Sequence, residues 1–305
     1  MKRTLVQGWV DCLYKENYKS FYLAFLRVAI SLWLLKEVFI NWAGMDILYS
    51  PKSFVVRNDG TLFSSLPVKF SVVRDHYQWL IGVYIVVLLL NIAGIGRWVT
   101  AILLFLLMDT VHKLNFGFVN GGDILARLIV FYLVFANSYE YFVLFKSKDK
   151  DPERKKLSNL MSNLAAYSIM LQLCVAYLSS AIAKLHYPVW LNGEALYYTL
   201  SMERFVGTPL NHFMAQSALL VKIGSYATLA FELSFPFLIW VKGCRKPLLI
   251  AGVLFHLFIY IFLMIYGFQI VFVLTYGLFL SNEEVVRIAT AVKLFFSKLV
   301  IVGRK

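Results

Sequence analysis

Apolar stretches of about 20 residues follow one another along nearly the whole sequence, with only short polar segments between them. A helix needs roughly 20 mostly apolar residues to cross about 30 Å of hydrocarbon. Charged residues make up 15% of the chain, against about 25% in an ordinary soluble domain, and the mean hydropathy is +0.70. These features predict an all-α, polytopic integral membrane protein with no independent soluble domain.

Eight segments predict transmembrane helices that form one domain over residues 1–305. The stretch 247–280 is too long for one helix, and Gly267 stands where a hairpin could turn, so it is divided in two. The expected spans are 20–41, 77–96, 98–114, 121–145, 163–185, 214–241, 247–263 and 266–280.

The basic residues predict the orientation of these helices. The net charge is +13, but the charges lie in short segments between apolar spans, which is typical of membrane proteins and argues against nucleic-acid binding. With both termini cytoplasmic, 19 basic residues fall inside and 6 outside. The loops 42–76 and 186–213 then lie outside and fold over the outer mouth of the bundle. The tail 283–301 predicts a helix, either along the inner membrane surface or continuing into the cytoplasm.

Cysteine spacing argues against a metal site, and the N-terminal residues argue against a cleavable signal peptide. Cys12, Cys174 and Cys244 match no metal or disulfide pattern, so no metal site is expected. The first 20 residues contain no apolar run, which argues against a cleavable signal peptide.

Ionisable residues inside predicted spans are the candidates for function, because a charge within a bilayer is costly. Five of them belong to the outer half and predict a polar cavity open to the outside, His256 is near mid-span, and Arg27 and Glu232 fall in the inner half. The outer five are Glu37, Asp109, Asp123, Arg127 and Lys184.

Each candidate also has a purely structural alternative. Asp123 and Arg127 have the four-residue spacing of an intrahelical ion pair. Arg27 could pair with Glu232 or with backbone. Lys184 could extend to the membrane interface, His256 could be a hydrogen-bonded core residue, and the glycines in Asn120-Gly-Gly-Asp123 could serve packing or a ligand.

Several motifs resemble the HTTM family, the membrane domain shared by vitamin K-dependent gamma-glutamyl carboxylases, sporulation-delaying protein B and many bacterial proteins. The main one is LQLCVAYLSSAIAKL at 171–185 followed by WLNGEALYY at 190–198. Others are FLR at 25–27, FEL at 231–233 and FHL at 255–257, in the same order as in the family. The resemblance covers about residues 20–285.

The resemblance implies roles for particular residues. In the carboxylase, the Lys of this motif is the proposed base that deprotonates vitamin K hydroquinone, and it corresponds to Lys184. The His of the late helical pair corresponds to His256. A Lys in an apolar cavity can act as a neutral base near pH 7. The candidate catalytic residues are therefore Lys184 and His256, with Asn120, Asp123, Arg127, Trp190 and Gly193 as candidate substrate-binding residues.

The sequence also departs from the carboxylase. An Asn-Asn-His run at the mouth of the fourth helix is replaced by Asn120-Gly-Gly-Asp123, and the large lumenal domain is not present within 305 residues. Both departures argue against glutamate carboxylation itself.

Two functions from different classes follow from these observations. The first is a membrane-embedded enzyme with carboxylase-like or quinol-epoxidase-like activity, which uses reduced vitamin K or another quinol and acts on that quinol or on a secreted peptide. The alternative is a non-catalytic accessory protein for toxin peptide maturation or export. A transporter is disfavoured because no internal repeat is present. Membrane lipids are the expected partners, and the bacterial cytoplasmic membrane is the expected location.

Overall fold

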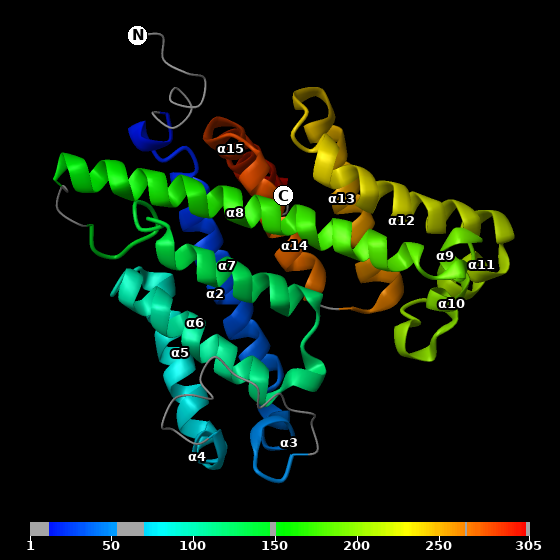
Figure 1. Ribbon diagram of the computed structural model, residues 1–305, viewed down its shortest axis with the longest axis horizontal. Helices are drawn as coiled ribbons and strands as arrows, with labels where there is room; N and C mark the ends of the chain where they lie inside the picture. Colours follow the sequence, from blue (N-terminus) through cyan, green and yellow to red (C-terminus); the bar gives the residue numbers. More distant parts are fainter. Residues whose placement is uncertain (1–11, 54–69, 147–150, 266, 303–305) are drawn as a thin grey trace. The chain divides into compact units, whose positions relative to one another are not determined.

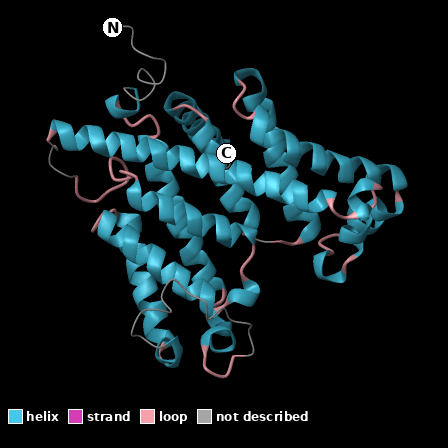
Figure 2. Ribbon diagram, viewed as in Figure 1, coloured by secondary structure: helices cyan, strands magenta, loops and turns pink. Residues whose placement is uncertain are grey.

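The computed structural model describes residues 12–53, 70–146, 151–265 and 267–302, which contain helices and connecting loops and no strand (Figure 2). The all-α prediction is confirmed for these residues. A helix satisfies its backbone hydrogen bonds within its own segment, which is what a lipid environment demands of an apolar chain.

Long helices and short helical segments both occur along the described chain. The first part contains α2 (Ser20–Ile40), η1 (Trp42–Gly44), α3 (Met45–Tyr49), α4 (Phe70–Asp75), α5 (Tyr77–Ala93), α6 (Trp98–Leu114), η2 (Phe116–Phe118), α7 (Gly121–Phe135) and α8 (Pro152–Leu185). The second part contains α9 (Pro188–Leu191), α10 (Ala195–Ser201), η3 (Glu203–Phe205), α11 (Leu210–Gln216), α12 (Ala218–Leu238), α13 (Lys242–Leu263), α14 (Phe268–Tyr276), η4 (Gly277–Phe279) and α15 (Asn282–Val302).

Three described helices, α8, α12 and α13, are long and apolar enough to cross a membrane by length and composition. The helix α5 and the stretch Phe268–Phe279 are apolar but shorter. Each of the eight expected segments contains a helix, while eight membrane crossings stay a prediction. The expected loop 42–76 lies partly outside the described residues.

The largest differences between the expected spans and the observed helices are at two boundaries. The helix expected over 121–145 ends at Phe135, because the following polar residues bond outside it: the Asn137 amide donates to Ser162 Oγ at 2.8 Å. The helix expected over 163–185 begins at Pro152, because residues 153–162 are polar but include Glu, Arg, Lys and Leu, which favour a helix as well.

The described chain forms two compact units. Unit 1 consists of residues up to 119, 129–167 and 280 onward, and unit 2 of 120–128 and 168–279. Within unit 1, α5 packs against both α2 and α6, and α15 contacts α2 (Figure 1).

Arg27 is the largest fully buried side chain in the described part of unit 1, with 1% of its surface exposed. Its Nε donates to the Ser138 carbonyl at 3.1 Å, and its Nη2 donates to the Phe142 carbonyl at 2.7 Å. The remaining guanidinium contacts are the carbonyls of Asn91, Ile92 and Tyr141. Of the two structural alternatives for Arg27, the backbone one is confirmed: it fastens the C-terminal end of α5 to the segment 138–142.

Unit 2 contains the second half of α8 and the helices α9 to α14. Within it, α12 packs against α10, α11 and α13, and α13 packs against α14. The segment 186–213, expected as a loop, contains α9, α10, η3 and part of α11. The Leu196 amide donates to Ser225 Oγ at 3.0 Å, so α10 lies along the first half of α12.

Candidate functional site

Unit 2 contains a pocket of about 530 Å³, within the range of about 300–1,000 Å³ that is usual for ligand sites. Its wall is mostly apolar and aromatic, with residues from α7, α8, α9, α10, α12, α13 and α14. The polar side chains in the wall are Gln172, Tyr177, Ser179, Ser180, Lys184, Thr199, Thr228, Glu232 and His256. An apolar cavity with a few polar groups is the usual form of a small-molecule site.

One face of α8 supplies three of these polar groups. Tyr177, Ser180 and Lys184 follow one another at spacings of three and four residues, which places them on the same side of a helix. Lys184 lies in the last turn of α8, which ends at Leu185.

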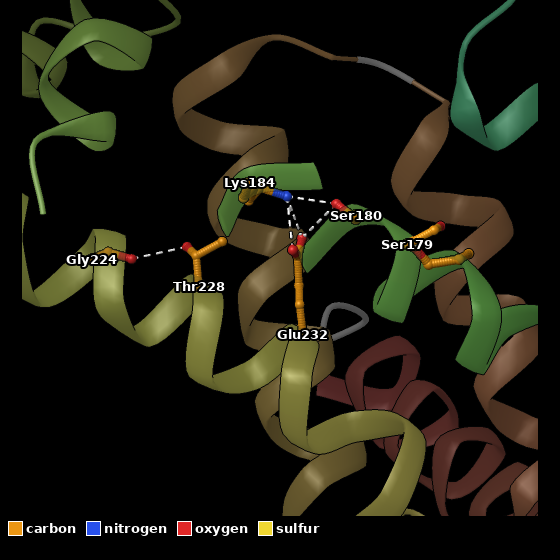
Figure 3. Close-up of polar contacts among 7 residues, drawn as sticks. Ser179, Ser180, Lys184, Gly224, Thr228 and Glu232 are labelled. Atoms are coloured by element: carbon orange, nitrogen blue, oxygen red, sulfur yellow. Dashed lines mark hydrogen bonds and ion pairs between the residues drawn. The ribbon is translucent and has the colours of Figure 1, made fainter. Parts of the chain in front are cut away.

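Lys184 forms an ion pair with Glu232 across the pocket wall (Figure 3). The Lys184 Nζ lies 2.7 Å from Glu232 Oε2 and 2.8 Å from Oε1, and it donates to Ser180 Oγ at 2.6 Å. Ser180 Oγ in turn donates to Glu232 Oε1 at 3.2 Å. The exposed fraction of the side chain is 21% for Lys184 and 6% for Glu232. The pair is therefore largely removed from solvent, where each charge depends on its partner.

This contact shows that the expected depths of Lys184 and Glu232 cannot both be right. Glu232 comes 14 residues after α12 begins at Ala218, about 21 Å along the helix axis. Lys184 ends α8 beside it, and α9 and α10 continue from there along the first half of α12. The sequence predicts Lys184 in the outer half of the membrane and Glu232 in the inner half. This combination is wrong, because two charged groups 2.7 Å apart lie at the same depth.

Trp190 and Gly193 follow Lys184 in the motif and have different surroundings. The Lys184 Nζ lies 5.2 Å from the centre of the Trp190 ring, and Trp190 lines the pocket. Such a geometry allows a cation–π interaction. Gly193 has a φ of +73°, and a Cβ there would lie 2.9 Å from the Tyr226 ring. Gly193 thus forms the turn before α10, outside the pocket lining.

His256 lies in a buried hydrogen-bonded chain of aromatic residues, with 1% of its surface exposed. Its Nε2 lies 2.7 Å from the Tyr177 hydroxyl, which also bonds to the Tyr276 hydroxyl. The ring centre of Phe272 lies 5.0 Å from that of His256. Gly252 makes room for the chain, since a Cβ there would lie 2.5 Å from Tyr276 Oη. His256 and Lys184 therefore line the same pocket, each with its own polar partners.

Asn120 and Asp123 form a cap at the start of α7. Asn120 Oδ1 accepts from the Gly122 amide at 2.7 Å, and Asp123 Oδ2 accepts from the Asn120 amide at 2.8 Å. A Cβ on Gly122 would lie 2.7 Å from Phe268 Cα, so this glycine serves packing against α14. Asn120, Asp123 and Arg127 do not line the pocket. Their substrate contacts, and the Asp123–Arg127 ion pair, stay predictions.

Several residues of this site were not among the predicted catalytic ones. Ser180 and Tyr177 could have been identified from their spacing to Lys184 on one helix face. Glu232 was recognised as a charge within a span, but its partner is on another helix, and spacing along one helix carries no information about that. Among the described residues, no group of three His, Cys, Asp or Glu side chains could hold a metal ion.

The family profile of the HTTM domain matches residues 16–283, which is most of the chain. No curated protein and no solved structure matches the sequence. The matched region includes the Lys184–Glu232 pair, the His256 chain and every residue of the pocket wall. The chain therefore belongs to the HTTM domain family, whose members have a helical membrane domain related to that of the carboxylase.

Proposed function

We propose that the protein is a membrane-embedded enzyme that removes a proton from a lipid-soluble quinol, with Lys184 as the base and His256 as its partner. The observation that carries this proposal is the position of an ion-paired Lys in the wall of a mostly apolar pocket. A charged pair is expensive in such surroundings, so its presence favours a chemical role over a packing role.

The residues of the pocket suit a quinol. Aromatic side chains such as Phe255, Phe268 and Phe272 line it and provide faces for a flat ring. The quinol supplies an acidic hydroxyl, and by resemblance to the carboxylase its reaction with O2 gives the epoxide and water. Lys184 receives the hydroxyl proton at Nζ, and its ammonium form then stabilises the oxyanion. His256 and Tyr177, which are hydrogen-bonded to each other, provide polar groups in another part of the wall.

One observation favours the accessory role in peptide maturation instead. Lys184 is fully occupied by Glu232 and Ser180, as it would be in a structural ion pair beside a peptide groove. In that case a secreted peptide would occupy the pocket and no quinol would be converted.

Replacing Lys184 is expected to separate these functions. With vitamin K hydroquinone and O2, Lys184→Met should form epoxide about 10²-fold more slowly than the wild type, because a positioned base contributes at least that factor. Lys184→Arg keeps a cation beside Glu232 but cannot become a neutral base, so it should be equally slow. Epoxide is measured by chromatography with the protein in lipid nanodiscs.

Lys222→Met is the matched control, because Lys222 is an exposed Lys on α12. It should convert the quinol at the wild-type rate. Equal rates for the Lys184 and Lys222 variants would exclude Lys184 as the base. A wild-type protein that forms no epoxide would leave the accessory role as the better explanation.

We also propose eight membrane crossings with both termini on the cytoplasmic side of a bacterial cytoplasmic membrane. The excess of basic residues in the proposed inner segments, 19 against 6, supports this orientation. In a cysteine-free background, an impermeant thiol reagent added to whole cells should label a Cys at Asn192 and spare one at Glu153. The reverse labelling pattern would overturn the proposed orientation.

A further inference from the structure

The hydrogen bonds of Lys184 leave it no free donor. An ammonium group has three N–H bonds, and the three acceptors around Nζ are Ser180 Oγ and the two oxygens of Glu232, all within 2.8 Å. A proton acceptor needs a free lone pair, which an ammonium nitrogen does not have. Lys184 can take a proton from a ligand only after one of its own protons has moved elsewhere.

Glu232 is positioned to receive that proton. It is the only carboxylate in the pocket wall as described, and both of its oxygens contact Nζ. Ser180 joins the two residues in a closed ring, since it accepts from Lys184 and donates to Glu232. A proton can therefore pass from Lys184 Nζ to the Glu232 carboxylate directly or through Ser180, and no further side chain is needed.

We infer that Glu232 is a further catalytic residue and holds the proton that the pair removes from the ligand. This inference rests on the proposed function. In the first step a proton moves from Lys184 Nζ to a Glu232 oxygen, which gives a neutral amine and a carboxylic acid. In the second, the ligand hydroxyl gives its proton to the amine, which leaves an oxyanion beside the ammonium. The net change is one proton from the ligand hydroxyl to Glu232.

The surroundings of the pair favour this transfer. In water the proton would stay on the amine, since the reference pKa of Lys is about six units above that of Glu. In an apolar pocket, the transfer removes two poorly solvated charges at once, which offsets much of that difference. After the second step, the negative charge of the ligand oxyanion lies next to the positive charge of the ammonium, so the site stays neutral in total. No step leaves an isolated charge in the pocket.

The other titratable side chains in the described pocket wall, Tyr177 and His256, form no hydrogen bond with Lys184 or Glu232. The second ring nitrogen of His256, Nδ1, has no hydrogen-bond partner among the described residues, and a proton held there would give no carboxylic-acid band. Tyr177 on α8 and His256 on α13 are bonded to each other, and Tyr177 is also bonded to Tyr276 on α14. The wall residues from α7, α9 and α10 are Gly, Ile, Trp, Leu and Thr, which do not titrate.

Infrared difference spectroscopy tests where the proton goes without requiring turnover. Vitamin K hydroquinone is added without oxygen to the wild type, and the C=O stretch of a protonated carboxylic acid is sought, with D2O exchange to identify it. The band is expected in the wild type, absent in Glu232→Gln, and shifted in Glu232→Asp. It should persist in Glu203→Gln, which removes an exposed carboxylate of the same unit. A band that survives in Glu232→Gln, or no band in the wild type, would overturn the inference.

Activity provides the second readout. At neutral pH, Glu232→Gln should form epoxide about 10²-fold more slowly than the wild type, because the pair then lacks the carboxylate that holds the proton. Epoxide formation at the wild-type rate in Glu232→Gln would contradict a catalytic role for Glu232. If epoxide forms and its formation requires Lys184, but the infrared band is absent, the inference about Glu232 is overturned and the proposed function stands. The band without any epoxide overturns the proposed function alone, and the absence of both overturns both.

Discussion

Replacing Arg27 with Met is expected to lower the free energy of unfolding by about 3–5 kcal/mol. The guanidinium donates to backbone carbonyls of α5 and of the segment 138–142, and it is 1% exposed. A buried carbonyl left without a donor costs about 1–3 kcal/mol. Met would remove the guanidinium donors from the buried Ser138 carbonyl and from the partly buried carbonyls of Tyr141 and Phe142, whereas the Asn91 carbonyl still accepts from the Gly94 amide. A cation at the C-terminal end of α5 also favours the helix dipole there, and that interaction would be lost. Unfolding by SDS in mixed micelles measures the difference.

Two other variants distinguish the hydrogen-bond fork of Arg27 from its charge. Arg27→Lys keeps the charge with fewer donors and a different geometry, so its stability should fall between the wild type and Arg27→Met. Arg97→Met is the matched control, because the Arg97 guanidinium also lies near the Tyr139 ring but donates a single hydrogen bond among the described residues, to Asn137 Oδ1 at 3.3 Å. If Arg27→Met is no less stable than Arg97→Met, the carbonyl contacts of Arg27 do not stabilise unit 1.

The positions of the helices could largely be predicted from apolar length. The helix expected over 98–114 is α6, with the same limits, and the one expected over 20–41 is α2, which ends one residue earlier. Apolar length works because backbone groups in a lipid environment have few alternatives to a helix. It fails where polar residues continue a helix, as at the start of α8, and where aromatic and apolar residues form short helices, as in 186–213.

The candidate site could be predicted in part. Lys184, His256 and Trp190 all line the pocket, as does Glu232, a candidate charge within a span to which the sequence assigns no catalytic or substrate-binding role. Periodicity identifies residues that share a face of one helix, such as Ser180 and Lys184. It does not identify which helices face each other, and the pairing of Lys184 on α8 with a carboxylate on α12 depends on that arrangement.

The same limit explains the misplaced depths. Counting residues from the end of a span assumes that each connection returns directly to the membrane surface. The segment 186–217 instead lies beside the first half of α12, the helix that follows it in the chain. Lys184, which precedes this segment, therefore contacts Glu232 in the later part of α12. Only contacts such as that of Leu196 with Ser225 reveal this path.

The Lys184–Glu232 pair should contribute little net stability, although each half depends strongly on the other. Lys184→Met leaves a buried carboxylate with Ser180 as its remaining donor, and Glu232→Leu leaves an ammonium without its counter-ion. Each single change should lower the free energy of unfolding by about 3–5 kcal/mol. The double variant removes both charges from an apolar wall, so it should unfold within about 1 kcal/mol of the wild type.

The double variant should nevertheless form no epoxide, which would separate the stability of the site from its chemistry. The four proteins of this cycle are compared by SDS unfolding in mixed micelles and by epoxide formation from vitamin K hydroquinone. Replacing the exposed pair Lys156–Glu153 by Met and Leu is the control and should leave stability unchanged, since both side chains are well solvated. If the double variant loses the sum of the two single effects, the charges are not coupled and each stabilises the fold by its own contacts. If it matches the wild type in stability and lacks activity, the pair contributes to the chemistry of the pocket at little cost to the fold.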